Sequence, residues 1–272
     1  MVKDESLYLA IVDDAFDMFN RQMRTDYSRD NIEVKLIDAK SADKEISKFL
    51  ENYPEVIEEQ MLEPGYYRSI RAEAFVSSDR KGMILRTDTG EHDLAWRHLV
   101  LHELCHIYAV THELDGANFY KKYCIDYAEG EIQDGIINAG YAIWREFVAE
   151  FFAHLLDEDL MDGVLDANVD HLEWLLDDIE DLVDDAKYCV SAVLIDLFTT
   201  REVMQEPDIE GVLALTGQFD RLSSENWKGI IQIIYEQIFR EEFYKIDIDF
   251  ISELGSYYIS LKTELYMKKL GI

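Results

Sequence analysis

Residues 96–110 read WRHLVLHELCHIYAV, and this stretch decides how the rest of the chain is interpreted. Its apolar residues are nearly continuous, which is typical of a helix buried on most sides. Within it, His102, Glu103 and His106 form an H-E-x-x-H pentad. Ionisable groups in a buried helix are costly unless each of them is satisfied, so the pentad indicates a chemical role.

The spacing of the pentad favours a metal site. Side chains four residues apart on a helix differ in direction by about 40°, so His102 and His106 can bind one ion. Glu103 points about 100° away from His102, which suits it to reach a water molecule on the metal. Zinc held in this way keeps an open position and lowers the pKa of its water to about 7. The other interpretation is two hydrogen-bonded core histidines with Glu103 paired to an arginine.

Length and composition indicate a folded protein without a membrane span. The chain has 272 residues, of which 48% are hydrophobic, enough for one large domain or two. It has no run of 18 apolar residues and no signal-peptide pattern at its start. The 3 cysteines, Cys105, Cys124 and Cys189, are widely spaced, which fits a reducing compartment. We therefore expect a cytoplasmic protein.

The charge balance narrows the choice of partners. The chain has 26 basic and 57 acidic residues, for a formal net charge of −31. Such a charge repels nucleic acid and anionic membranes and attracts cationic partners. We expect no nucleic-acid or membrane partner, and a peptide or protein partner that is basic. The sequence does not indicate an oligomeric state.

The periodicity of apolar residues predicts a mainly helical α+β fold with a small mixed sheet. Strands are expected at 32–37, 71–77 and 83–87, with a hairpin loop at 78–82. Helices are expected at 5–24, from 41 to Pro54, and at 92–111, 116–128, 134–158, 168–186, 187–204, 209–220, 224–243 and 248–269. The sheet should pack on the pentad helix in residues 1–163, and residues 164–272 should form a helical subdomain. The boundary near Gly163 is soft, and the chain could be one domain.

Two segments and the order of elements resemble the zincin metallopeptidases of the gluzincin type, over about residues 70–156. They are the pentad and residues 144–153, WREFVAEFFA. The resemblance implies Glu146 as the third zinc ligand and Glu150 as a carboxylate that orients a ligand histidine. Gluzincins often have aspartate at this later position, so Glu150 is a departure. The resemblance also implies that an edge strand, here 83–87, binds extended peptide.

Two other residues compete to be the third ligand. His112 follows His106 by six residues, as in metzincins, but Ala109 stands where that family has the glycine that ends the helix. Asp115 opens a segment, DGANF, that resembles the H-G-x-x-F start of the ligand helix in SprT-like proteases, with aspartate in place of histidine. Both remain alternatives at this point.

Several further residues receive no single role from the sequence. His98 shares the face of His102, and His154 follows Glu150 by four residues. Gluzincins also use a downstream tyrosine, histidine or arginine to stabilise the oxyanion. Tyr141, Tyr257 and Tyr258 are candidates here, and their spacing does not select one of them.

These observations predict a zinc-dependent metallopeptidase, a hydrolase in which His102, His106 and Glu146 hold Zn²⁺ and Glu103 is the general base. One alternative is a non-catalytic or regulatory zinc-binding protein that uses a zincin scaffold to bind a basic partner. Another is a protease of a single protein target, inactive on general peptides.

Overall fold

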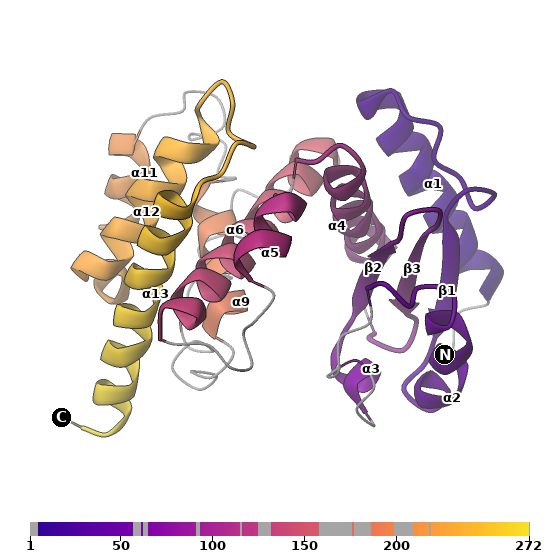
Figure 1. Cartoon of the computed structure of the whole chain (residues 1–272), viewed down its shortest axis with the longest axis horizontal. Helices are drawn as coiled ribbons and strands as arrows, with labels where there is room; N and C mark the ends of the chain where they lie inside the picture. The colour runs from indigo at the N-terminus through magenta and orange to yellow at the C-terminus, as the bar shows by residue number, and fades with distance from the viewer. Residues whose placement is uncertain are drawn as a thin grey trace. The chain divides into compact units, whose positions relative to one another are not determined.

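Figure 1 shows the fold of the chain as a computed structural model. It describes residues 5–56, 61, 65–90, 93–114, 116–124, 132–157, 176, 186–198, 209–217 and 219–271. The chain divides into two compact units: residues 1–112 with 152–158, and residues 113–151 with 159–272. The expected boundary near residue 163 lies outside the described residues. Each unit is described by itself below.

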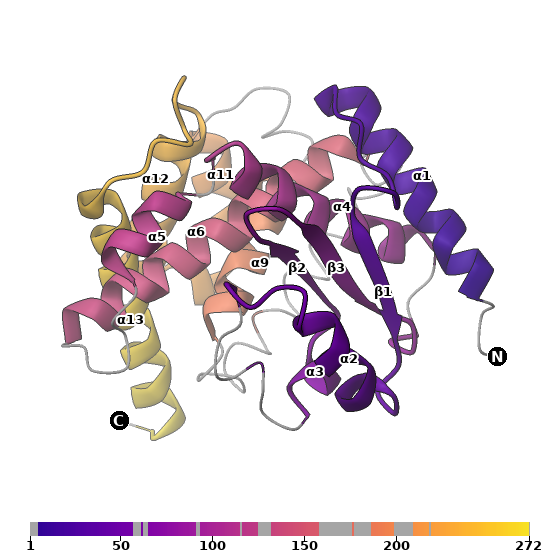
Figure 2. The same cartoon turned by 45° about the vertical axis from the view of Figure 1, so that its right-hand side comes forward.

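The first unit is built on a three-stranded mixed sheet of β1 (Glu33–Ile37), β2 (Ala72–Val76) and β3 (Lys81–Arg86) (Figure 2). The strand order is β1-β3-β2, with β1 parallel and β2 antiparallel to β3. β1 and β2 fall where the sequence predicts them, and β3 begins at Lys81, inside the range predicted as the hairpin loop. The prediction that residues 83–87 form an edge is wrong, because β3 is hydrogen-bonded on both sides. β1 and β2 are the outer strands.

Helices cover both faces of this sheet. They are α1 (Glu5–Met23), α2 (Ala42–Leu50), α3 (Tyr66–Ser69) and α4 (Asp93–Thr111). Phe75 and Ile84 join a core with residues of α2 and α3 on one face. On the other face, α4 contacts β2 and β3 and packs against α1. Side chains alternate along a strand, so the small residues Ala72 and Ala74 point toward α4 and allow its close approach.

The middle strand β3 is buried because both of its faces are covered. Met83, Ile84 and Leu85 are fully buried. Gly82 is required on the α2 face, since an added Cβ there would overlap the rings of Tyr53 and Phe49. A continuous apolar run of this kind is typical of a strand that is covered on both sides.

The pentad helix α4 is anchored to the end of β3. Trp96 is 1% exposed, and its indole N–H donates a hydrogen bond to the carbonyl of Arg86 over 2.9 Å. The ring of Tyr8 from α1 lies 4.7 Å from the Trp96 ring. These contacts fix the start of α4 against both α1 and the sheet, so the register of the pentad is set by the core.

The described part of the second unit is helical. Its elements are α5 (Ala117–Tyr123), most of α6 (Ile132–Leu156), α9 (Ala186–Phe198), α11 (Ile209–Thr216), η4 (Asp220–Leu222), α12 (Glu225–Ile238) and α13 (Ile248–Lys269). The expected helix 168–186 lies almost wholly outside the described residues. α6 and α13 cross closely, since a Cβ on Gly140 would overlap the backbone of Ile251 and Gly255.

The mainly helical fold with a small mixed sheet is therefore confirmed. Among the described residues, none of the helices combines the length and the apolar character that crossing a membrane requires.

Candidate metal centre

The two pentad histidines lie side by side on α4. The Nε2 atoms of His102 and His106 are 3.0 Å apart, and the ring centroids are 4.7 Å apart at an interplanar angle of 82°. His106 is buried and His102 is half-buried. Two imidazole nitrogens bound to one tetrahedral zinc ion, each at about 2.05 Å, would themselves be about 3.3 Å apart. The pair therefore fits a shared ion with little movement.

Glu146 lies with this pair in one group of possible metal ligands. The ligand atoms of His102, His106 and Glu146 all lie within 4.8 Å of one another. Glu146 is half-buried on α6, between the buried residues Trp144 and Phe147. Two neutral imidazoles and one carboxylate make up a donor set that suits zinc and related divalent metals. The residues present thus fit the metal that the sequence predicts.

The placement of α6 beside α4 rests on contacts at the end of α6. The ring centroids of His98 and His154 are 4.4 Å apart. Arg97 Nη2 donates to Asp157 Oδ1 over 2.6 Å, and the two side chains are 9% and 0% exposed. Arg97 Nη1 also donates to Asp14 of α1 over 3.3 Å. A buried ion pair therefore joins the start of α4 to the residue that follows α6.

Glu103, the residue that the sequence predicts as general base, is buried on α4. It is 4% exposed and sits on the same turn of α4 as His102. A carboxylate with so little access to water is costly to bury unless it is satisfied. Its burial distinguishes it from the many surface carboxylates of this acidic chain.

A second group of possible ligands lies on the same two helices. The ligand atoms of His98, Glu150 and His154 also lie within 4.8 Å of one another, and all three residues are half-buried. The sequence predicts Glu150 as a carboxylate that orients a ligand histidine, and the structure brings it together with His98 and His154. The signal in the sequence is the four-residue repeat His98, His102, His106 on one helix and Glu146, Glu150, His154 on the other.

The sequence offers two alternatives to Glu146 as the third ligand, His112 and Asp115, and the structure describes only His112. His112 is exposed and stacks on Tyr108 with ring centroids 3.9 Å apart. α4 continues through Ala109 to Thr111, and His112 is in neither group of possible ligands among the described residues. Asp115 lies outside the described residues.

The tyrosine candidates for the oxyanion lie in the second unit. Tyr141 is 5% exposed and stacks on Phe119, with ring centroids 5.8 Å apart. Tyr258 is 3% exposed, and Tyr257 packs over Gly229. The choice among them stays open.

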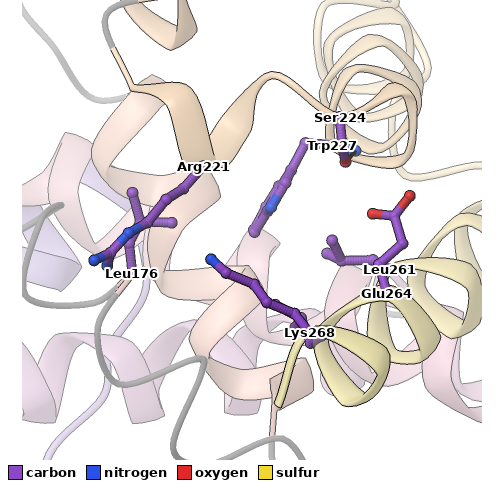
Figure 3. Close-up of a pocket in the computed structure, with 8 residues that line it drawn as sticks. Leu176, Arg221, Ser224, Trp227, Leu261, Glu264 and Lys268 are labelled. Atoms are coloured by element: carbon purple, nitrogen blue, oxygen red, sulfur yellow. Dashed lines mark hydrogen bonds between the residues drawn. The ribbon is translucent and has the colours of Figure 1, made fainter. Parts of the chain in front are cut away.

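A pocket between α12 and α13 is separate from the candidate ligands. It is lined by Leu176, Arg221, Ser224, Trp227, Leu261, Glu264, Leu265 and Lys268 (Figure 3). It encloses about 110 Å³, below the roughly 300–1,000 Å³ of typical small-molecule sites. None of the pentad residues or of the residues gathered with them lines it, so it is not the candidate functional site.

Comparison with known proteins found no matching family model, no matching curated protein and no matching solved structure.

Proposed function

We propose that this protein is a zinc-dependent metallopeptidase in which His102, His106 and Glu146 hold the ion and Glu103 is the general base. The observation that carries the proposal is that the ligand atoms of His102 and His106 and that of Glu146, which follows them by 44 and 40 positions, lie within 4.8 Å of one another. The pair distance of 3.0 Å between the two Nε2 atoms adds to its support.

The chemistry divides between the ion and the chain. Zinc, when bound, polarises the scissile carbonyl and lowers the pKa of a water molecule beside it. The Glu103 carboxylate accepts a proton from the attacking water as the new C–O bond forms. Glu103 then gives this proton to the amine nitrogen as the C–N bond breaks. Water and a peptide bond thus become a carboxylic acid and an amine.

The order of elements also supports a zincin-like scaffold. A hairpin, a pentad helix packed beneath it, and a later helix with a ligand glutamate follow one another as β2-β3, α4 and α6. Because β3 is the middle strand, we assign the peptide-binding edge to β2, which packs against α4. An extended substrate would pair by strand addition with the side of β2 that faces away from β3.

The net charge suggests the kind of peptide. At −31, the chain attracts positively charged partners over distances of about a Debye length. We propose lysine- and arginine-rich polypeptides as substrates. The preference for them should weaken with added salt.

The test separates zinc binding from hydrolysis. Glu103→Gln keeps the shape of the side chain but removes the general base, so the variant should bind zinc as tightly as the wild type and lose at least about 100-fold in hydrolysis rate. Hydrolysis is measured on an unfolded basic polypeptide, and zinc by elemental analysis. Glu113→Gln makes the same chemical change at an exposed position near the end of α4 and should leave both quantities unchanged.

The same assays decide between this function and its main rival. A non-catalytic zinc protein that binds a basic partner is favoured by the charge alone. Such a protein would bind zinc and the basic polypeptide without cleaving it, and Glu103→Gln would change neither affinity. Hydrolysis by the wild type that persists in Glu103→Gln would refute the role of Glu103. A single-target protease would cleave its target and spare general peptides.

A further inference from the structure

A second set of metal-binding groups lies along the same pair of helices. We propose that His98, Glu150 and His154 bind a second divalent cation of the first transition row. This inference goes beyond the proposed function and does not depend on hydrolysis. It rests on three ligand atoms that lie within 4.8 Å of one another.

The donor set selects the class of ion. Two imidazoles and one carboxylate suit zinc, cobalt, nickel or ferrous iron. Calcium and magnesium prefer sets made of oxygen atoms. The set has the same composition as His102, His106 and Glu146, so the two sites should accept the same metals.

The histidines of this set are already in contact. The rings of His98 and His154 are 4.4 Å apart at centroid and inclined by 73°. The corresponding values for His102 and His106 are 4.7 Å and 82°. The second pair thus has nearly the ring arrangement of the first, although its members come from two different helices.

The surroundings hold these ligands in place. The buried ion pair of Arg97 and Asp157 lies beside them, with Arg97 adjacent to His98 in sequence and Asp157 three residues after His154. The ion pair spans 2.6 Å and is nearly closed to solvent. A ligand set that is held before the ion arrives loses less conformational entropy on binding.

The separation of the two sets decides how they can work. The centre of the first set lies about six residues from the centre of the second on each helix, which is about 9 Å at 1.5 Å per residue. Two-metal catalytic centres have ions about 3.5–4 Å apart. The second ion therefore forms a separate site. Its effect is structural: an ion bound by His98 of α4 and by Glu150 and His154 of α6 would hold the two helices together as a clamp.

The clamp assigns a new role to Glu150. The zincin resemblance implies that this carboxylate orients a ligand histidine, whereas the geometry makes it a ligand itself. Loss of the second ion would weaken the link between α4 and the end of α6. The protein would then melt at a lower temperature even with the first site filled.

The experiment counts zinc ions. Protein stripped with a chelator is titrated with zinc, and bound ions are counted by native mass spectrometry and isothermal titration calorimetry. The wild type should bind two ions, and His98→Ala and His154→Ala should bind one. Glu150→Gln preserves side-chain shape and should weaken binding of the second zinc ion by more than about 100-fold. A residue that only orients a ligand through a hydrogen bond costs at most about that factor when it is replaced.

Matched variants connect each ion to its set. His106→Ala should also bind one ion, and the double variant His98→Ala/His106→Ala should bind none. His112→Ala removes an exposed histidine and should still bind two. Glu103→Gln should bind two ions whether or not the protein is a peptidase, so failure of the hydrolytic proposal does not affect this count.

The result that overturns the proposal is equally direct. Zinc binding that is unchanged in count and affinity in both His98→Ala and His154→Ala excludes the site, whether the wild type binds one ion or two. If an alanine variant does not fold, Glu150→Gln decides alone: unchanged binding of two ions refutes the assignment.

Discussion

The buried ion pair that joins α4 to the end of α6 gives a sharp test of how the site is assembled. In Asp157→Asn, the side chain keeps its shape but loses its charge. Arg97 then stays buried without the carboxylate that lies 2.6 Å away in the wild type. We expect this single change to destabilise the protein and to weaken metal binding together.

The magnitude follows from burial. The side chains of Arg97 and Asp157 are 9% and 0% exposed, and removal of one member of a buried pair typically costs about 3–5 kcal/mol. Asp14 also accepts from Arg97 at 3.3 Å but is 61% exposed, so it compensates only in part. We expect a loss of about 3 kcal/mol. At about 2–4 °C per kcal/mol for a chain of this size, the melting temperature should fall by about 6–12 °C.

The control is an ion pair of the same chemistry at the surface. Asp13 and Arg29 are 2.7 Å apart, with side chains 49% and 43% exposed. Asp13→Asn should cost about 0.2–1 kcal/mol, as exposed pairs do. Unfolding is followed by urea titration and by calorimetry of the metal-free protein.

A double variant completes the cycle. Arg97→Met/Asp157→Leu removes both charges and fills the space with apolar groups. It should be closer to the wild type in stability than Arg97→Met alone or Asp157→Leu alone. The reasoning is refuted if Asp157→Asn loses no more than Asp13→Asn does. It is also refuted if the double variant loses the sum of the two single losses, since the pair would then contribute nothing as a pair.

Two further experiments test the packing of α6 and the ion pair between Arg86 and Asp88 at the end of β3. Gly140→Ala should destabilise the protein by about 1–3 kcal/mol, because the new Cβ would overpack against α13. Gly135→Ala lies in the same helix with open space at its Cβ and should stabilise the protein by about 0.5–1 kcal/mol. Equal effects of the two variants in urea titrations would contradict the close crossing of α6 and α13. A hydrogen bond from Arg86, 2.6 Å away, holds the pKa of Asp88 below its usual range, so this carboxylate stabilises the fold above the pKa of about 3.9 that it has when unfolded. Because Asp88 is 37% exposed, Asp88→Asn should lower stability by at most about 1 kcal/mol at pH 7. The difference should shrink as the pH falls below about 3.9, because the carboxyl group becomes protonated, and a difference that grows toward acid would have the wrong sign.

Much of the fold follows from local pattern. Residues 93–111 are helical and residues 72–76 and 81–86 are strands, close to the predicted ranges. Helices 225–238 and 248–269 begin after Ser224 and Asp247, whose side chains accept from the backbone N–H three residues later. These features depend on neighbours in sequence, so a single sequence carries them.

The order of strands does not follow from local pattern. Residues 83–87 were predicted at an edge by resemblance, whereas β3 lies between β1 and β2. The continuous apolar run of Met83, Ile84 and Leu85 was a signal against an edge, because an edge strand with one covered face alternates apolar and polar residues. Pairing of β3 with β1 joins segments almost 50 residues apart, and no local preference specifies it.

The candidate metal centre also has one part that the sequence predicts and one part that only the fold brings together. The sequence by itself determined the pair His102 and His106, because four residues of helix bring two side chains to one face wherever the helix lies. Only the tertiary structure brought His98 together with Glu150 and His154, since His98 lies more than 50 positions away from both along the chain. The packing of α4 on the sheet and the buried pair of Arg97 and Asp157 hold His98 and His154 together. They are contacts between distant segments, whose free energy depends on burial that exists only once the chain has folded.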